Sequence, residues 1–162
     1  MKTLIVSILL AITSFSNQMV ANQKFAYNCE MNGSQVSSET IYKVENGKYL
    51  FNHLKYNFAY DVDGRVSQKE VLKWNADSQN FEKQYVLNFT YSDTAVTIEY
   101  LTWNAKTEEF SNIREKAVYQ LSGKKNVVNY LAYEWDNKES NWNLVMQHCT
   151  ANWNNALLAT CK

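Results

Sequence analysis

The chain has 162 residues, and its 16 lysines and arginines balance 16 aspartates and glutamates, so the formal net charge is zero. This balance excludes the basic surface that recognises nucleic acid or an anionic membrane. Proline is absent, only four glycines occur and aromatic residues make up 14% of the chain, a composition that favours half-buried strands.

The first predicted element is a signal peptide over residues 1–21. It has a positive start at Lys2, an apolar run over residues 4–15, and small residues that allow cleavage after Ser16 or Ala21. The apolar run is shorter than the roughly 20 residues that a membrane-spanning helix needs. We therefore expect residues 22–162 to form a single exported domain, secreted or periplasmic, without membrane insertion.

Strands are the next predicted elements, because β-rich runs lie between turn signals. Asn32-Gly33, Asn46-Gly47 and Asp63-Gly64 are typical of tight hairpin turns. Short connections pair neighbours antiparallel, which predicts an all-β, up-and-down meander of about nine strands built from hairpin repeats. We expect it to curl into a barrel-like or an open curved sheet. The predicted strands are 24–31, 35–44, 48–60, 65–74, 81–91, 95–103, 110–120, 126–135 and 142–149.

Alternation of apolar residues predicts which faces are buried. In strand 48–60 the apolar residues stand at even positions, from Leu50 to Tyr60, which indicates one buried face. Strand 126–135 is apolar at both odd and even positions, so we expect it to be the most central strand. The tail from residue 150 fits a short helix or a final edge strand.

A tandem repeat runs through the chain from residue 74 onward. Each copy is a Trp, six mostly polar residues and a second aromatic residue, as in Trp74 to Phe81, and a worn copy runs from Tyr42 to Tyr49. Fixed spacings of this kind mark repeat architectures. The full copies are Trp74–Phe81, Trp103–Phe110 and Trp135–Trp142.

These aromatic pairs have two interpretations. In the first, the two rings of each copy face each other across a hairpin and stabilise its end. In the second, they form a row that binds a glycan, with polar side chains beside the stacking faces. The candidate ligand-binding residues are Trp74, Trp103, Trp135, Trp142, Asn75 and Asn104.

We find no catalytic or cofactor-binding motif in the sequence. Neither His53 nor His148 has a carboxylate or cysteine at metal-ligand spacing, so we predict no metal site and no cofactor. The Asp61-x-Asp63-Gly64 stretch lacks the carboxylates of a calcium loop and predicts a hairpin turn instead.

Three cysteines, Cys29, Cys149 and Cys161, cannot all pair within one chain. A Cys29–Cys149 disulfide would join the first and last long strands, and a Cys149–Cys161 disulfide would only fix the tail. We predict the first pairing, because it would latch a closed sheet.

Two resemblances follow from these motifs. The Tyr-Asp-x-x-Gly-Arg-Val stretch at Tyr60–Val66 resembles the YD-repeat signature of bacterial surface proteins. Signal peptide, size and Trp-x6-aromatic repeats together look like a family of small exported bacterial proteins of unknown function. This resemblance implies an all-β exported protein and transfers no site residues.

The sequence therefore indicates a non-catalytic binding module for a glycan or another envelope protein. The alternative is a structural or assembly protein that recruits partners through an exposed edge strand or surface contacts.

Overall fold

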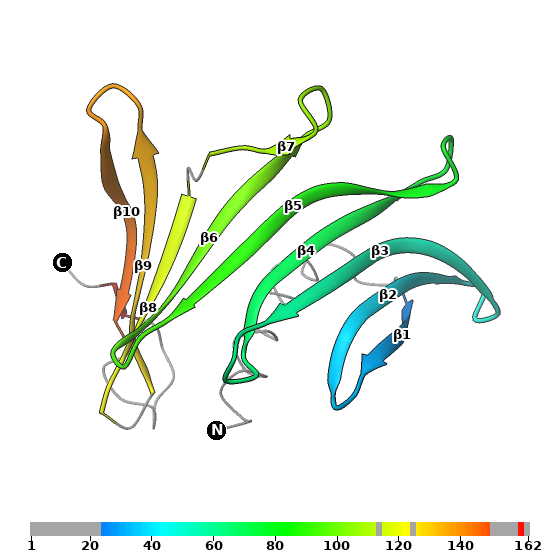
Figure 1. Ribbon diagram of the computed structural model, residues 1–162, viewed down its shortest axis with the longest axis horizontal. Coiled ribbons are helices and arrows are strands. Elements are labelled where there is room, and N and C mark those ends of the chain that lie inside the picture. The colour runs from blue at the N-terminus through cyan, green and yellow to red at the C-terminus, as the bar shows by residue number, and fades with distance from the viewer. Residues whose placement is uncertain (1–23, 113–114, 124–125, 150–158, 161–162) are drawn as a thin grey trace. The chain divides into compact units, whose positions relative to one another are not determined.

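The computed structural model describes residues 24–112, 115–123, 126–149 and 159–160, and all regular structure in them is β-strand (Figure 1). The predicted signal peptide and Cys161 lie outside these residues. No described helix has the length and apolar character to cross a membrane. The chain divides into two compact units, residues 1–84 and 85–162, which are described separately, and the prediction of one domain stays a prediction.

The first unit is an antiparallel meander. It contains β1 (Lys24–Asn32), β2 (Gln35–Glu45), β3 (Tyr49–Tyr60), β4 (Val66–Asn75) and the beginning of β5 (Asn80–Tyr91). β2 pairs with β1 and β3, and β3 pairs in turn with β4, all antiparallel. The core of this unit contains the buried side chains of Ile41, Tyr56, Val66 and Val71.

The second unit continues from β5 through β6 (Ala95–Asn104), β7 (Glu109–Phe110), β8 (Glu115–Leu121), β9 (Val127–Asp136), β10 (Asn141–Cys149) and β11 (Ala159–Thr160). β6 pairs with β5 and β8 along its length, and with β7 near its end. β8, β9, β10 and β11 follow as successive antiparallel neighbours. The buried core side chains here are Val86, Leu87, Phe89, Val96, Ile98 and Leu131.

The predicted fold class is confirmed. The strand order is sequential and linear, so the meander is open rather than closed into a barrel. Predicted strand 110–120 is two elements, β7 and β8, on either side of residues 113–114. In the tail, the two residues of β11 pair with His148 and Cys149 at the end of β10.

The prediction that strand 126–135 is the most central is wrong. Of the residues in β9, only Leu131 is buried, whereas β4, β5 and β6 each bury several. The aromatic residues of β9 pack against rings on neighbouring strands instead of a core. Tyr130 lies 5.1 Å from Tyr119 and Trp135 lies 5.4 Å from Trp142, measured between ring centroids.

A β-bulge interrupts the alternation predicted for strand 48–60. Ile41 pairs with Leu54, but the next residue, Tyr42, pairs with Asn52, so His53 has no opposite residue on β2. One extra residue shifts the pleat, and the side chains before it change face. Leu50 therefore lies on the face opposite to Leu54, although both stand at even positions.

Candidate functional site

The Trp hairpins have the geometry of cross-strand aromatic pairs. Trp103 is the register partner of Phe110, and Trp135 is that of Trp142. The ring centroids lie 5.0 Å apart for Trp74 and Phe81, 4.9 Å for Trp103 and Phe110 and 5.4 Å for Trp135 and Trp142, with interplanar angles of 69°, 67° and 71°. These are edge-to-face contacts, the arrangement that the ring quadrupole favours. The four Trp side chains of these three pairs are half-buried.

The polar residue after each Trp organises the turn. Oδ1 of Asn75 accepts hydrogen bonds from the backbone N–H groups of Asp77 at 2.8 Å and Ser78 at 3.4 Å. Oδ1 of Asn104 accepts from the N–H of Lys106 at 3.0 Å, and Oδ1 of Asp136 from that of Lys138 at 2.7 Å. These Asx turns give the side chains predicted to bind a ligand a structural role in the hairpin.

Each hairpin turn also contains a left-handed residue, four positions after the Asn or Asp that forms the Asx turn. These residues are Gln79 with φ 52°, Glu108 with φ 54° and Ser140 with φ 50°. The worn copy has Gly47 there, with φ 66°. A non-glycine residue in this conformation is strained by its Cβ, at roughly 1–2 kcal/mol.

Replacing Gln79, Glu108 or Ser140 with Gly should therefore stabilise the chain by about 1 kcal/mol per site, the strain partly offset by the freedom that Gly adds to the unfolded chain. Urea unfolding measures this change. Ala105→Gly is the control, because Ala105 is a turn residue without positive φ, and it should stabilise nothing. A loss of stability in all three glycine variants would contradict the strain argument.

The YD-like stretch forms a second kind of turn. Oδ1 of Asp61 accepts hydrogen bonds from the backbone N–H groups of Asp63 at 3.0 Å and Arg65 at 2.9 Å, and its Oδ2 accepts from Nε of Arg65 at 2.7 Å. These bonds hold the pKa of Asp61 below its ordinary value, although desolvation opposes them. The Tyr60 hydroxyl donates to the Val36 carbonyl at 2.8 Å. The motif is thus a stapled hairpin turn.

Lys69 is the most unusual ionisable residue in the described chain. Its side chain is only 3% exposed, and its Nζ lies 3.6 Å from the centroid of the Tyr56 ring and 5.9 Å from that of Phe58. Burial lowers the pKa of Lys69 to about 8, and the Glu39 carboxylate partly opposes this shift. A buried amine held over an aromatic face gains cation–π attraction in place of hydration.

The two histidines contact aromatic rings and do not form part of a metal-binding cluster in the described residues. His53 stacks on Phe25 with ring centroids 5.6 Å apart, and burial, assisted by the charges of Lys43 and Lys73, lowers the pKa of His53. His148 lies 6.3 Å from the Tyr130 ring, and its buried Nδ1 has no hydrogen-bond partner in the described part of the chain. Within the described residues, no three His, Cys, Asp or Glu side chains gather as metal ligands do.

The Cys29–Cys149 disulfide is absent, which corrects the prediction of a latched sheet. Cys29 is a free, exposed thiol, and Cys149 is disulfide-bonded. Cys29 lies opposite Glu39 on β2, and its Sγ donates a 3.8 Å hydrogen bond to Oε1 of Glu39. Cys161, the other partner considered for Cys149, lies outside the described residues.

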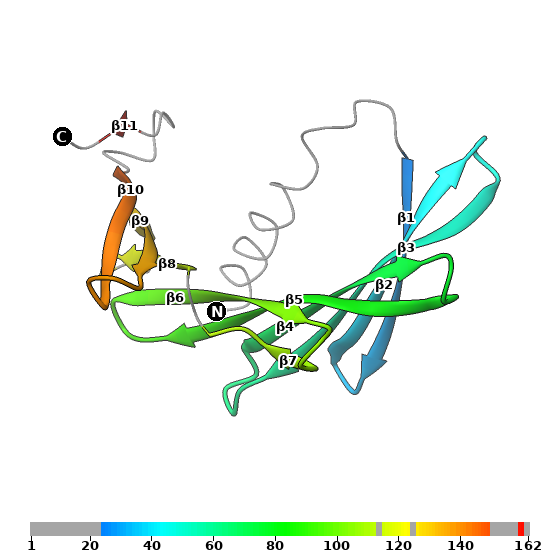
Figure 2. The same cartoon turned by 90° about the horizontal axis from the view of Figure 1, so that it is seen from above.

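The end of the β2–β3 hairpin carries an exposed apolar cluster that the sequence did not predict. Tyr49, Leu50 and Phe51 are 55%, 56% and 50% exposed. β3 pairs with β4 only from Leu54 onward, so these residues lie beyond that pairing. In Figure 2 the hairpin end, in cyan, rises away from the end of the β4–β5 hairpin. We call Tyr49, Leu50 and Phe51 the β3 apolar end.

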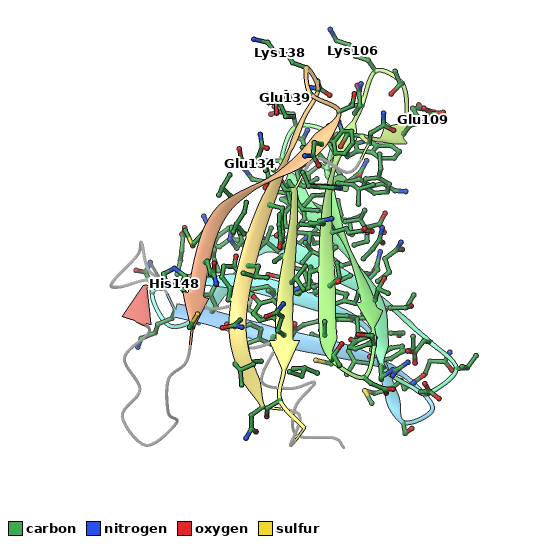
Figure 3. The ribbon with its side chains drawn as sticks, turned by 90° about the vertical axis from the view of Figure 1, so that its left-hand side faces the viewer. Lys106, Glu109, Glu134, Lys138, Glu139 and His148 are labelled. Atoms are coloured by element: carbon green, nitrogen blue, oxygen red, sulfur yellow. The ribbon has the colours of Figure 1, made fainter. Side chains whose placement is uncertain are left out.

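The second unit has its own exposed features. Leu144, Val145 and Met146 on β10 are 48%, 53% and 49% exposed, and Val145 is the extra residue of a bulge. Figure 3 shows the β6–β7 and β9–β10 hairpin ends at the same end of this unit. Each hairpin end carries charged residues of both signs, Lys106 and Glu109 on the first and Lys138 and Glu139 on the second. His148 lies toward the other end of β10.

Sequence reasoning missed the β3 apolar end because alternation assigned Leu50 to the buried face. The usable signal was the unbroken apolar run Tyr49-Leu50-Phe51, since a half-buried strand alternates and a run of three does not.

Fold and site together define an all-β meander protein in which aromatic pairs join the strands of three hairpins and strands β3 and β10 carry exposed apolar side chains. The chain matches the family of unknown function DUF3836 over residues 1–121 and belongs to that family. This supports the resemblance to a family of unknown function, while the Trp-x6-aromatic repeat as its signature stays a prediction.

Solved structures agree with the fold. The chain is similar to a protein of unknown function from Bacteroides fragilis, with TM-score 0.71, 21% identity and coverage of 83% of this chain and 97% of that one. A DUF3836 protein from Bacteroides vulgatus gives TM-score 0.51 and 36% identity, over 53% of this chain and 87% of that one. A third, from Parabacteroides distasonis, gives TM-score 0.55 and 22% identity, over 64% and 94%. No curated protein matches the chain.

Proposed function

We propose that this protein is an exported, non-catalytic interaction protein that binds another protein of the cell envelope. The observation that carries the proposal is the β3 apolar end, where three consecutive side chains are each at least half exposed. Scattered apolar residues are ordinary on a surface, but a contiguous apolar group marks an interaction site. Aromatic residues such as Tyr49 and Phe51 are also enriched at interfaces.

The backbone beside this cluster favours a protein partner over a small molecule. Residues 49–53 of β3 extend beyond the pairing with β4, so their outer edge is available for an added strand. Tyr49 and Phe51 lie on one face, opposite Glu45 and Lys43 of β2, and Leu50 lies on the other. A partner segment that pairs with this edge would contact apolar side chains on both faces.

Capture from envelope extract of the native host tests the proposal. The immobilised wild-type chain should enrich a protein that the variant Tyr49→Ser, Leu50→Ser, Phe51→Ser does not retain. Val62→Ser is the matched control, because Val62 is 102% exposed but lies in the turn after β3. Identical protein sets on all three chains, each confirmed as folded by circular dichroism, would contradict the proposal.

Glycan binding at the Trp hairpins is the second candidate. It is favoured by the partial exposure of Trp103, Trp135 and Trp142, whose hairpin ends lie at the same end of the second unit (Figure 3). The Asx turns oppose it, because Asn75 and Asn104 already use their Oδ1 atoms within the turns. A glycan array probed with the purified wild-type chain tests this candidate.

A further inference from the structure

We infer that a second copy of this chain pairs with β1, antiparallel, about a two-fold axis at Cys29. The inference goes beyond the proposed function, because it assigns a different partner, a second copy of the chain, to a second surface. That surface is the free edge of the first strand, which is distinct from the β3 apolar end.

The edge of β1 is regular enough to accept a strand. β1 pairs with β2 from Lys24 to Asn32 and has no second strand neighbour in the described residues. The register shift after Glu30 is taken up by β2, where Ser37 is the extra residue, so β1 keeps its alternation. Proteins protect edges with bulges, charges or proline. The edge strand β1 contains neither bulge nor proline, and its two charged residues are Lys24, at its first position, and Glu30.

Side chains on one face of β1 complement themselves about Cys29. Tyr27 and Met31 are each 57% exposed, and Cys29 lies between them. In an antiparallel pair centred on Cys29, Tyr27 of each copy lies opposite Met31 of the other. The interface therefore gains two contacts between an aromatic ring and a thioether, which attract each other.

The other face of the pair brings together groups that also suit each other. Asn28 of each copy lies opposite Glu30 of the other, so an amide meets a carboxylate and like charges do not meet. This Glu30 already accepts a hydrogen bond from Ser38 at 2.6 Å and lies 3.9 Å from Nζ of Lys55, which holds its carboxylate in place. Both faces thus fit the same register, as a two-fold interface requires.

The Cys29 thiol reports this register directly. Opposite residues of an antiparallel pair have Cα atoms about 4.5–5.5 Å apart, within the roughly 4.4–6.8 Å range of disulfides. Cys29 is free and exposed. Diamide oxidises two thiols to one disulfide and takes up their two protons and two electrons, so it can join two Cys29 residues that face each other.

Sedimentation velocity of the purified chain, from low to high micromolar concentration, tests the pairing. The wild-type chain should shift from the monomer mass to twice that mass, and Tyr27→Lys with Met31→Lys should stay monomeric. Leu144→Lys with Met146→Lys is the matched control, because it adds the same charges to the edge-proximal strand β10, and it should still form the dimer. Diamide should give a Cys29–Cys29 peptide in the wild type, by mass spectrometry without reductant, and at least tenfold less of it in the Tyr27/Met31 variant.

Three results would overturn the inference: a wild-type chain that stays monomeric, a dimer that survives Tyr27→Lys with Met31→Lys, or a dimer lost in the β10 control. Circular dichroism checks that each variant is folded, and Tyr27→Ser with Met31→Ser replaces the lysine variant if that one unfolds. A monomeric wild-type chain that still captures its envelope partner would overturn this inference alone. If the chain forms the dimer but the serine variant of the β3 apolar end captures the same envelope proteins as the wild type, the proposed function alone would be overturned.

Discussion

Replacing Lys69 with Met should abolish a rise in unfolding free energy that the wild-type chain shows from pH 8 toward pH 10.5. The pKa of Lys69 is lowered from 10.5 to about 8 in the folded chain, because its amine is buried against Tyr56 and Phe58. Since one pKa unit corresponds to 1.36 kcal/mol, the rise is roughly 3 kcal/mol.

The sign follows from proton binding. Between pH 8 and 10.5 the unfolded chain keeps the proton of Lys69 while the folded chain has released it, so stability increases with pH and the gain is complete above 10.5. Tyr119, whose pKa burial raises to about 12, acts in the opposite direction above pH 10. Subtracting the profile of the Met variant from that of the wild type cancels the tyrosine contribution.

Urea unfolding at several pH values measures this difference. At pH 7 the Met variant should be the more stable chain, because the charged amine no longer has to be desolvated. Lys73→Met is the matched control, since Lys73 is an exposed lysine on the same face of β4. A difference between wild type and Lys69→Met that does not change with pH would contradict the buried-amine argument.

Trp103→Ala should destabilise the chain by about 3 kcal/mol, the low end of the range for large buried aromatic residues, because Trp103 is half-buried. The Trp103 ring packs edge-to-face on Phe110 at 4.9 Å, and β7 has only two register pairs to β6, one of them Trp103–Phe110. Loss of the ring should therefore also weaken the pairing of β7 with β6, where the hydrogen bond from the Ser111 N–H to the Thr102 carbonyl at 2.8 Å remains.

Thermal and urea unfolding measure the loss, and a double-mutant cycle with Phe110→Ala should give a coupling of about 0.5–1.5 kcal/mol. A folded Trp103→Ala variant with unaltered unfolding would show that the ring is not a staple. Loss of glycan binding by that same variant would favour the second candidate function.

The hairpins were predictable from sequence because their signals are local. Gly33, Gly47 and Gly64 all have positive φ, as their Asn-Gly and Asp-Gly contexts predict. The spacing from Trp103 to Phe110 directly predicts two rings facing each other across a turn. Local signals also predict strand bounds, which differ from the structure by one or two residues for most strands.

Features that depend on pairing between strands were not predictable. The extra residue His53 leaves no mark in the alternation, yet it moves Leu50 to the other face. The sequence analysis did not single out Lys69, because only the register of β3 with β4 places it beside Phe58 and over Tyr56. The cysteine pairing failed because it assumed a closed sheet, whereas the strand order is linear.

The bulge at Val145 in β10 limits the stoichiometry of self-association. A sheet with two regular edges can add copies at both and grow into a filament. In β10 the extra residue breaks the regular spacing of the backbone hydrogen-bonding groups. In a symmetric dimer the free β1 edge of each copy is occupied by the β1 strand of the other. Association through β1 should therefore end at two copies, and higher concentration should populate the dimer without a series of larger species.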